Sequence, residues 1–165
     1  MVNIITIDGP AGVGKGTISK LLAKYLDAKV LNSGEIFRTI AYYLKNNKVD
    51  FKNNSSVINN IKKFKYEKIS SNKLYSSDID LISSYISMIP SLRKVTIKIQ
   101  RDFVELNENS ERTIIAEGRD MGTVIFPKAD IKIFMWADPE IRAKRRLLQI
   151  DKSLKTRKYS KILDS

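Results

Sequence analysis

The sequence Gly9-Pro10-Ala11-Gly12-Val13-Gly14-Lys15-Gly16-Thr17 lies between an apolar run, Val2–Ile7, and a segment with the apolar spacing of a helix. This order predicts a strand, a glycine-rich turn and a helix. Glycines allow successive backbone N–H groups to point at a polyphosphate, and the helix N-terminus adds partial positive charge. Lys15 supplies a mobile ammonium group, so we expect it to be catalytic. We expect all nine residues of the loop to bind the phosphates of ATP.

The residue after the lysine narrows this hypothesis. The common phosphate-binding loop has Ser or Thr there, and its hydroxyl meets Mg²⁺. Here Gly16 occupies that position and Thr17 follows. The Lys-Gly-Thr sequence resembles nucleoside monophosphate kinases, which transfer the terminal phosphoryl group of ATP to a nucleotide. The structural alternative is a tight turn that needs glycine and binds nothing.

Length and composition limit the fold and the chemistry. A chain of 165 residues with 42% hydrophobic residues suits one compact domain, residues 1–165. It contains no cysteine, which excludes disulfides and indicates a reducing, cytoplasmic location. It contains no histidine, but phosphoryl transfer depends mainly on positioning and charge stabilisation. We find neither a signal peptide nor an apolar run of roughly 18 residues, so we expect no membrane partner.

The charge balance is strongly basic, with a formal net charge of +12. Residues 142–161 contain nine basic side chains and one acidic side chain, Asp151. Such a cluster can indicate nucleic-acid binding. The cluster is also compatible with an exposed helix face, with a codon bias that favours lysine, or with an active site that concentrates arginine near the phosphates of its substrates. We do not expect a nucleic-acid partner, and we expect a monomer.

Three further strands are expected after the glycine-rich loop, with helical patterns between them. They are Lys29–Leu31, Arg112–Ala116 and Ile131–Trp136. Alternating strands and helices predict an α/β chain with an open, mainly parallel sheet and helices on both faces, which is the P-loop NTPase fold. We expect four strands in this sheet.

The helices are predicted from apolar stripes and capping residues. A helix from about Gly34 is expected after a cap at Asn32 or Ser33. Asp78 is expected to cap a helix that ends near Met88. Pro90 is expected to begin another, reaching about Leu106. Its inward face is predicted to carry Leu92, Val95, Ile99, Phe103 and Leu106.

Two segments show weaker sequence signals for helices and strands. Within residues 46–80 we expect a short helix, Ser55–Phe64, and a hairpin formed by Lys65–Ile69 and Leu74–Tyr75. The whole segment is expected to be a small insertion and not a second domain. Asp138-Pro139-Glu140 predicts the start of a helix that runs to about Ile150.

Several motifs together resemble the bacterial cytidylate kinase family. They are Asn32-Ser33-Gly34 with Arg38 after it, Pro90 with Arg93, and Glu117-Gly118-Arg119-Asp120-Met121-Gly122-Thr123. The last run is the most specific, because adenylate and guanylate kinases resemble this chain less there. The resemblance covers nearly the whole chain. It implies phosphorylation of CMP and dCMP with ATP and Mg²⁺.

The resemblance also implies the substrate-binding residues, which are Ser33, Arg38, Ser84, Arg93, Gly118, Arg119 and Asp120. Arg38 and Arg93 would grip phosphate oxygens bidentately, with Ser33 beside the acceptor phosphate. Ser84 and Asp120 would read the cytosine edge. Arg119 would lie near base and phosphate as a second catalytic residue. Residues 46–90 would form a small region that binds the nucleoside monophosphate, and no direct protein ligand for Mg²⁺ is predicted.

Each of these residues has a structural alternative. The alternatives are a helix cap for Ser33, exposed helix charges for Arg38 and Arg93, a polar helix position for Ser84, and a local ion pair for Arg119 with Asp120. Asp8, at the end of the first strand, either helps a Mg²⁺ site or accepts loop hydrogen bonds.

The family that this chain resembles continues beyond the equivalent of Ser165, with an Arg-Asp-x-x-Asp-x-x-Arg lid segment, a fifth strand and a closing helix. Residues 151–165 are therefore expected to begin an incomplete lid, and Ile131–Trp136 to be an unpaired edge. Arginines that neutralise the transferring phosphoryl group contribute roughly 10³–10⁵ in rate. Arg142, Arg145 and Arg146 are candidates to replace them in part.

The expected function is in-line transfer of the γ-phosphoryl group of ATP to CMP or dCMP, giving CDP or dCDP. One alternative is a truncated, catalytically weak or inactive relative that binds nucleotides. Others are a kinase for a different small acceptor and a basic module whose nucleic-acid binding depends steeply on salt.

Overall fold

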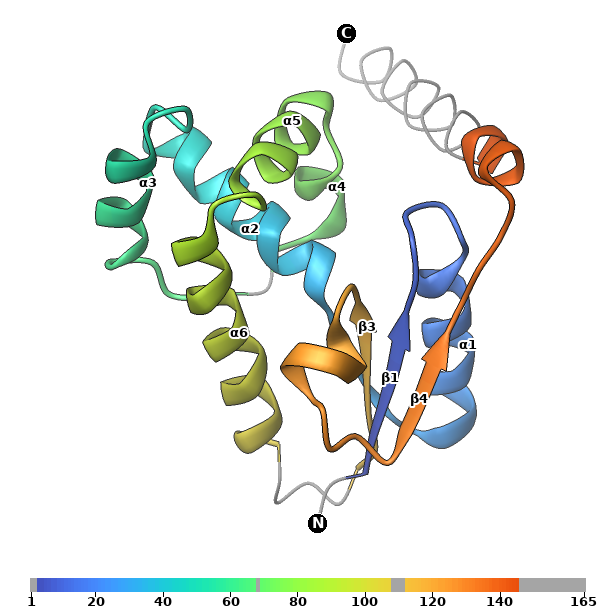
Figure 1. Ribbon diagram of the computed structural model, residues 1–165. Coiled ribbons are helices and arrows are strands. Elements are labelled where there is room, and N and C mark those ends of the chain that lie inside the picture. Colours follow the sequence, from blue (N-terminus) through green and yellow to red (C-terminus); the bar gives the residue numbers. More distant parts are fainter. Residues whose placement is uncertain (1–2, 68, 108–111, 146–165) are drawn as a thin grey trace, which may run out of the picture.

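The computed structural model describes residues 3–67, 69–107 and 112–145. In this part of the chain four parallel strands form one open sheet in the order β2-β3-β1-β4, with helices against both faces (Figure 1). The strands are β1 (Ile4–Asp8), β2 (Lys29–Asn32), β3 (Ile114–Gly118) and β4 (Ile131–Phe134). The predicted α/β fold with a parallel sheet is confirmed.

The central strands are apolar on both faces because helices cover both. Ile5 and Ile7 of β1 and Ile115 of β3 form a small core on one face. Helix α1 (Lys15–Leu26) covers this face and contributes Leu22. Side chains alternate along a strand, so the neighbours of Ile115 point the other way.

The larger core lies on the opposite face. Four helices surround it: α2 (Ser33–Asn46), α3 (Asn54–Ile61), α5 (Ser77–Ile86) and α6 (Pro90–Glu105). Helix α2 is at its centre, because Ile36, Ile40 and Leu44 recur every four residues and are fully buried. Figure 1 shows α3, α4 and α5 gathered around one end of α2, away from the sheet.

The predicted hairpin in residues 65–75 is wrong. Residues 64–67 are not in a strand, and α4 (Ser71–Leu74) is a short helix. Leu74 is buried, whereas Tyr75 beside it is 43% exposed. Phe64 and Tyr66 also pack against the main core, although residues 64–67 pair with no strand.

Three other details differ from the sequence predictions. Ser76, and not Asp78, caps α5, since its Oγ accepts from the backbone N–H of Ile79 at 3.3 Å. Leu106 is 85% exposed because α6 ends at Glu105. The buried face of α6 consists of Leu92, Thr96, Gln100 and Val104, while Val95, Ile99 and Phe103 are partly buried.

The last described segment is a helix over residues 139–145, as the Asp138-Pro139-Glu140 pattern predicts. The remainder of that predicted helix and the predicted lid start, residues 151–165, lie outside the described residues. Among the helices that the structure describes, none combines the length and the apolar character needed to cross a membrane.

Replacing Gly9 tests the close approach of the glycine-rich loop to the end of β4. Gly9 has a φ of 150°, and an added Cβ would lie 2.3 Å from the carbonyl oxygen of Met135. Because this obstacle is backbone, we expect Gly9→Ala to lower the free energy of unfolding by about 2 kcal/mol or more. Denaturant unfolding measures the loss. Ala11→Ser, at an exposed position of the same loop, is the control, and equal stability of both variants would contradict the prediction.

Candidate active site

The glycine-rich loop connects β1 to α1 at the carboxyl end of the parallel sheet, where open α/β sheets bind ligands. Gly14 is the N-cap of α1 with a φ of 106°, and no side chain caps the helix. Its carbonyl accepts from the N–H groups of Thr17 and Ile18. A helix that begins without a capping side chain leaves its first N–H groups available to an anion.

Lys15 closes this loop on itself. Its Nζ donates to the carbonyl oxygens of Gly9, at 2.7 Å, and Pro10, at 3.0 Å. Burial lowers the pKa of Lys15, and the nearby Glu117 carboxylate opposes that shift. The ammonium group is thus held against backbone carbonyl oxygens at the start of the loop.

A single cleft of about 1300 Å³ runs from this loop to α2, α5 and α6. All the substrate-binding residues predicted from the sequence line it: Ser33, Arg38, Ser84, Arg93, Gly118, Arg119 and Asp120. The loop contributes Ala11, Gly12, Gly14, Lys15, Gly16 and Thr17. Gly9 and Pro10 line a neighbouring cavity, and Val13 is buried. The structure thus brings both predicted groups of residues to one space.

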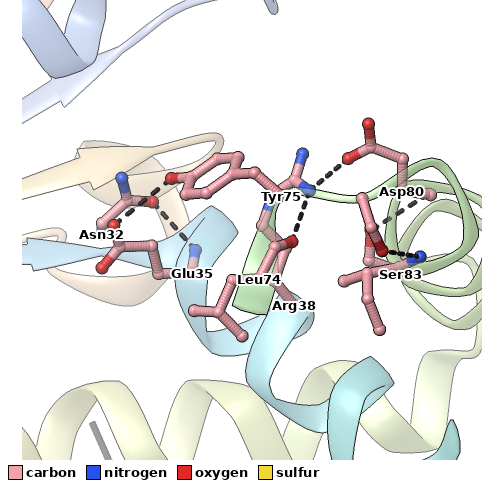
Figure 2. A network of polar contacts seen from close by, with 9 residues as sticks. Asn32, Glu35, Arg38, Leu74, Tyr75, Asp80 and Ser83 are labelled. Atoms are coloured by element: carbon pink, nitrogen blue, oxygen red, sulfur yellow. Dashed lines mark hydrogen bonds and ion pairs between the residues drawn. The ribbon is translucent and has the colours of Figure 1, made fainter. Parts of the chain in front are cut away.

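Arg38 is held in a polar network on the far side of the cleft (Figure 2). Its guanidinium group forms an ion pair with Asp80 of α5 and donates to the carbonyl oxygen of Leu74 at 3.2 Å. The guanidinium carbon lies 4.7 Å from the centre of the Tyr75 ring, whose hydroxyl donates to Glu35 at 3.3 Å. The side chain of Arg38 is only 16% exposed, so it is not simply a charge on an exposed helix face.

Arg93 and Ser84 reach the cleft from α6 and α5. The Nε of Arg93, in the first turn of α6, donates to the carbonyl oxygen of Ser87 at 2.8 Å. Ser84 is exposed at the cleft wall, one residue after the buried Ser83. Ser33 is 8% exposed, and the cap of α2 is Asn32. A capping role alone therefore does not explain Ser33.

Asp8 orients the turn that carries Arg119 and Asp120. Its carboxylate accepts from the backbone N–H groups of Met121, at 2.7 Å, and Gly122, at 2.8 Å. These bonds hold a short π-helical segment, Met121–Ile125, directly after the turn. Among the contacts of the described residues, no ion pair joins Arg119 to Asp120. The structure therefore shows Asp8 as a hydrogen-bond acceptor for this turn.

Comparison with known proteins agrees with this geometry. The model of the cytidylate kinase family matches residues 5–165. This chain belongs to the cytidylate kinase family.

Individual cytidylate kinases are similar over most of the chain. That of Mycoplasmopsis synoviae (strain 53) is 35% identical over 156 residues, which is 88% of this chain and 70% of that protein. That of Bartonella bacilliformis (strain ATCC 35685 / KC583 / Herrer 020/F12,63) is 36% identical over 160 residues, covering 97% of this chain and 73% of that protein. The bifunctional pantoate ligase/cytidylate kinase of Prochlorococcus marinus subsp. pastoris is 38% identical over 163 residues, where the match covers 31% of the longer protein. Membership of this family implies a nucleotide as phosphoryl donor.

The cytidylate kinase cleft also contains residues that sequence analysis did not single out as site residues. Glu117 is the last residue but one of β3 and is only 4% exposed. It belongs to the motif that carries the resemblance. Burial raises the pKa of Glu117, and hydrogen bonding to Ser19 and the charge of Lys15 oppose this. Asp80 and Tyr75 come from the segment with the weakest pattern, and no local signal marks them.

The basic segment after β4 contacts the glycine-rich loop. Arg142 lines the cleft and lies against Gly12, where an added Cβ would be 3.0 Å from the carbonyl oxygen of Arg142. Arg145 donates to the carbonyl oxygen of Val13 at 2.9 Å. Arg146, the third candidate, lies outside the described residues.

The raised pKa of Glu117 predicts a pH dependence of stability. The folded protein holds this proton more tightly than the unfolded chain, whose usual pKa is 4.5. The stabilisation from Glu117 is therefore complete below that pH and is lost as the pH rises through the raised pKa. Glu117→Gln removes this titration, so its free energy of unfolding, relative to the parent, should increase from acid to neutral pH. Denaturant unfolding at several pH values measures this difference, and a constant difference would contradict the prediction.

Proposed function

We propose that this chain transfers the γ-phosphoryl group of ATP to CMP or dCMP, giving CDP or dCDP. The observation that carries the proposal is the single cleft lined by Lys15 and the glycine-rich loop together with Arg38, Arg93 and Arg119. Two phosphate-binding groups that face one space suit a reaction between two phosphates. The printed names of the relatives support CMP as the acceptor.

The donor side would bind the phosphates of ATP. Backbone N–H groups at the start of α1 would contact the phosphates, and Lys15 would turn from the carbonyl oxygens of Gly9 and Pro10 to the β- and γ-phosphates. For Lys15 this exchanges neutral carbonyl acceptors for charged phosphate oxygens, which strengthens its hydrogen bonds. Lys15 and Arg119 are the proposed catalytic residues, because they would neutralise charge on the transferring group.

The acceptor side would bind CMP through its phosphate and its base. Arg38 and Arg93 would hold the phosphate, with Ser33 beside it. Ser84 and Asp120 would read the cytosine edge, where an unsuitable base would leave their polar groups unpaired. Residues 46–90, which include α3, α4 and α5, would act as a small region that closes over this nucleotide and excludes water.

Mg²⁺ is proposed to enter with ATP. Among the described residues no cluster of three acidic, cysteine or histidine side chains could hold a metal ion on its own. A polyphosphate bound at the loop fits this, since Mg²⁺ commonly takes most of its ligands from phosphates and water. Thr17, which lines the cleft, is a residue whose hydroxyl could offer a ligand to the ion. When bound, Mg²⁺ would neutralise phosphate charge.

A monomer in the cytoplasm remains the proposed state. All the proposed cleft residues come from one chain, so the site needs no second subunit. The absence of cysteine from the sequence supports a reducing compartment.

A coupled assay of ADP formation tests the function. ATP with CMP, dCMP, UMP, AMP or shikimate should give turnover with the two cytosine nucleotides and little with the others. Nucleotide binding by calorimetry without turnover would instead support the inactive, nucleotide-binding alternative.

Arg93 and Lys94 offer a matched pair on one helix. Arg93 lines the cleft and Lys94 is exposed outside it. Losing a charged hydrogen-bond partner of a phosphate costs about 2 kcal/mol or more, so Arg93→Ala should raise the KM for CMP at least about tenfold. Lys94→Ala removes the same charge and should leave the KM for CMP unchanged. Equal effects in the two variants would show that only net charge matters.

A further inference from the structure

One buried carboxyl group connects the two sides of the cleft. Glu117 accepts from the Oγ of Ser19 at 3.0 Å and from the Nδ2 of Asn32 at 2.5 Å. Ser19 belongs to α1, which begins at the glycine-rich loop, and Asn32 is the N-cap of α2, which carries Ser33 and Arg38. Glu117 therefore contacts both helices that would present phosphate-binding groups.

The side chain of Asn32 uses both ends of its amide. Its Oδ1 accepts from the backbone N–H of Glu35 at 3.0 Å and so caps α2. Its Nδ2 donates to Glu117, which lies directly opposite Asn32 in the register of β2 with β3. Since the same amide makes both bonds, the carboxyl group of Glu117 determines how the capping oxygen points.

The connection continues from the start of α2 to Arg38. Figure 2 shows Asn32 beside Glu35, and Glu35 beside the Tyr75 hydroxyl. The Tyr75 ring lies over the guanidinium group of Arg38. The first turn of α2 and the position of Arg38 are thus linked through two hydrogen bonds at Glu35, one to its backbone N–H and one to its carboxylate, and a cation–π contact.

We propose that Glu117 is a positioning residue for the acceptor nucleotide: by holding Asn32, it fixes the first turn of α2, and with it Ser33 and Arg38, relative to Lys15. This inference rests on the proposed function and adds a residue to it. Glu117 acts here through its hydrogen bonds and not through its charge.

The two helices depend on Glu117 unequally. The hydroxyl of Ser19 also reaches the carbonyl oxygen of Lys15, at 2.9 Å, and this bond within α1 remains when Glu117 is removed. Asn32 has no equivalent local partner for its Nδ2 among the bonds of the described residues. Removing Glu117 should therefore disturb the acceptor side and leave the ATP side nearly unchanged.

Three variants test the proposal by steady-state kinetics with CMP and ATP. Glu117→Ala should raise the KM for CMP by about tenfold, the effect of one lost buried hydrogen bond, and change the KM for ATP less than about twofold. Glu117→Gln retains an oxygen for Asn32 and offers an N–H to the Ser19 oxygen, so it should recover most of the affinity for CMP. Thr39→Val, which removes a buried hydroxyl bonded to the Glu35 carbonyl oxygen outside the cleft, is the control for lost stability.

The outcomes separate the alternatives. Equal loss of CMP affinity in Glu117→Gln and Glu117→Ala would assign the role to charge and overturn the proposal. The proposal would also be overturned if both variants had the same KM for CMP as the parent. If Glu117→Ala does not fold, Asn32→Ser replaces it, because serine keeps a capping oxygen but loses the bond to Glu117. An unchanged KM for CMP in that variant would equally overturn the proposal.

A measurement without nucleotides separates this proposal from the proposed function. Amide hydrogen exchange at the start of α2, around Glu35, should be faster in Glu117→Ala and close to the parent in Glu117→Gln. Unchanged exchange in Glu117→Ala would reject the positioning role whatever the activity. A parent chain without CMP-dependent ADP formation would reject the proposed function alone.

Discussion

The pairing of β1 with β3 is the constraint on which the cleft depends. The register places Asp8 opposite Gly118, so the glycine-rich loop after β1 and the Arg119–Asp120 turn after β3 leave the sheet side by side. The carboxylate of Asp8 then accepts two backbone N–H groups just beyond that turn. Adjacent parallel strands thus supply the proposed donor loop and one wall of the proposed acceptor site.

The electrostatics of the cleft show how its cationic groups are accommodated within the fold. Cationic groups that are partly removed from water are costly unless they are paired. Lys15 is satisfied by loop carbonyl oxygens and Arg38 by Asp80. A bound phosphate would therefore compete with these internal partners for Lys15 and Arg38, because neither cation is unpaired. The proposed site therefore exchanges one set of charge-assisted bonds for another.

The sequence was sufficient to predict those features of the fold that depend on the local pattern of apolar and capping residues. The strand–loop–helix unit, the four parallel strands and the start of α6 at Pro90 follow from apolar periodicity and helix-start signals. The hairpin predicted for residues 65–75 is wrong because Leu74 and Tyr66 contact the rest of the fold without strand pairing, which a local pattern does not reveal. The prediction that Leu106 faces inward is also wrong. Helix α6 ends at Glu105, so Leu106 lies beyond the helix and is exposed.

The same distinction applies to the site. Lys15, Arg38, Arg93 and Arg119 stand in motifs whose spacing has a chemical meaning, so the sequence predicts them as site residues, and all four line one cleft. Glu117 was quoted as part of such a motif, but its bonds to Ser19 and Asn32 depend on three elements meeting in space. Asp80 and Tyr75 lie in a segment rich in Asn, Lys and Ser, and only the fold brings them to Arg38. Roles of this kind become visible only with coordinates.

The most direct test of the account is the binding of a bisubstrate compound that joins adenosine and cytidine through a polyphosphate. If one cleft holds both nucleotides with their phosphates facing each other, calorimetry should show one molecule bound per chain, far more tightly than ATP or CMP alone, with both nucleotides displaced. Affinity no better than that of ATP, with CMP still able to bind beside the compound, would contradict a shared cleft.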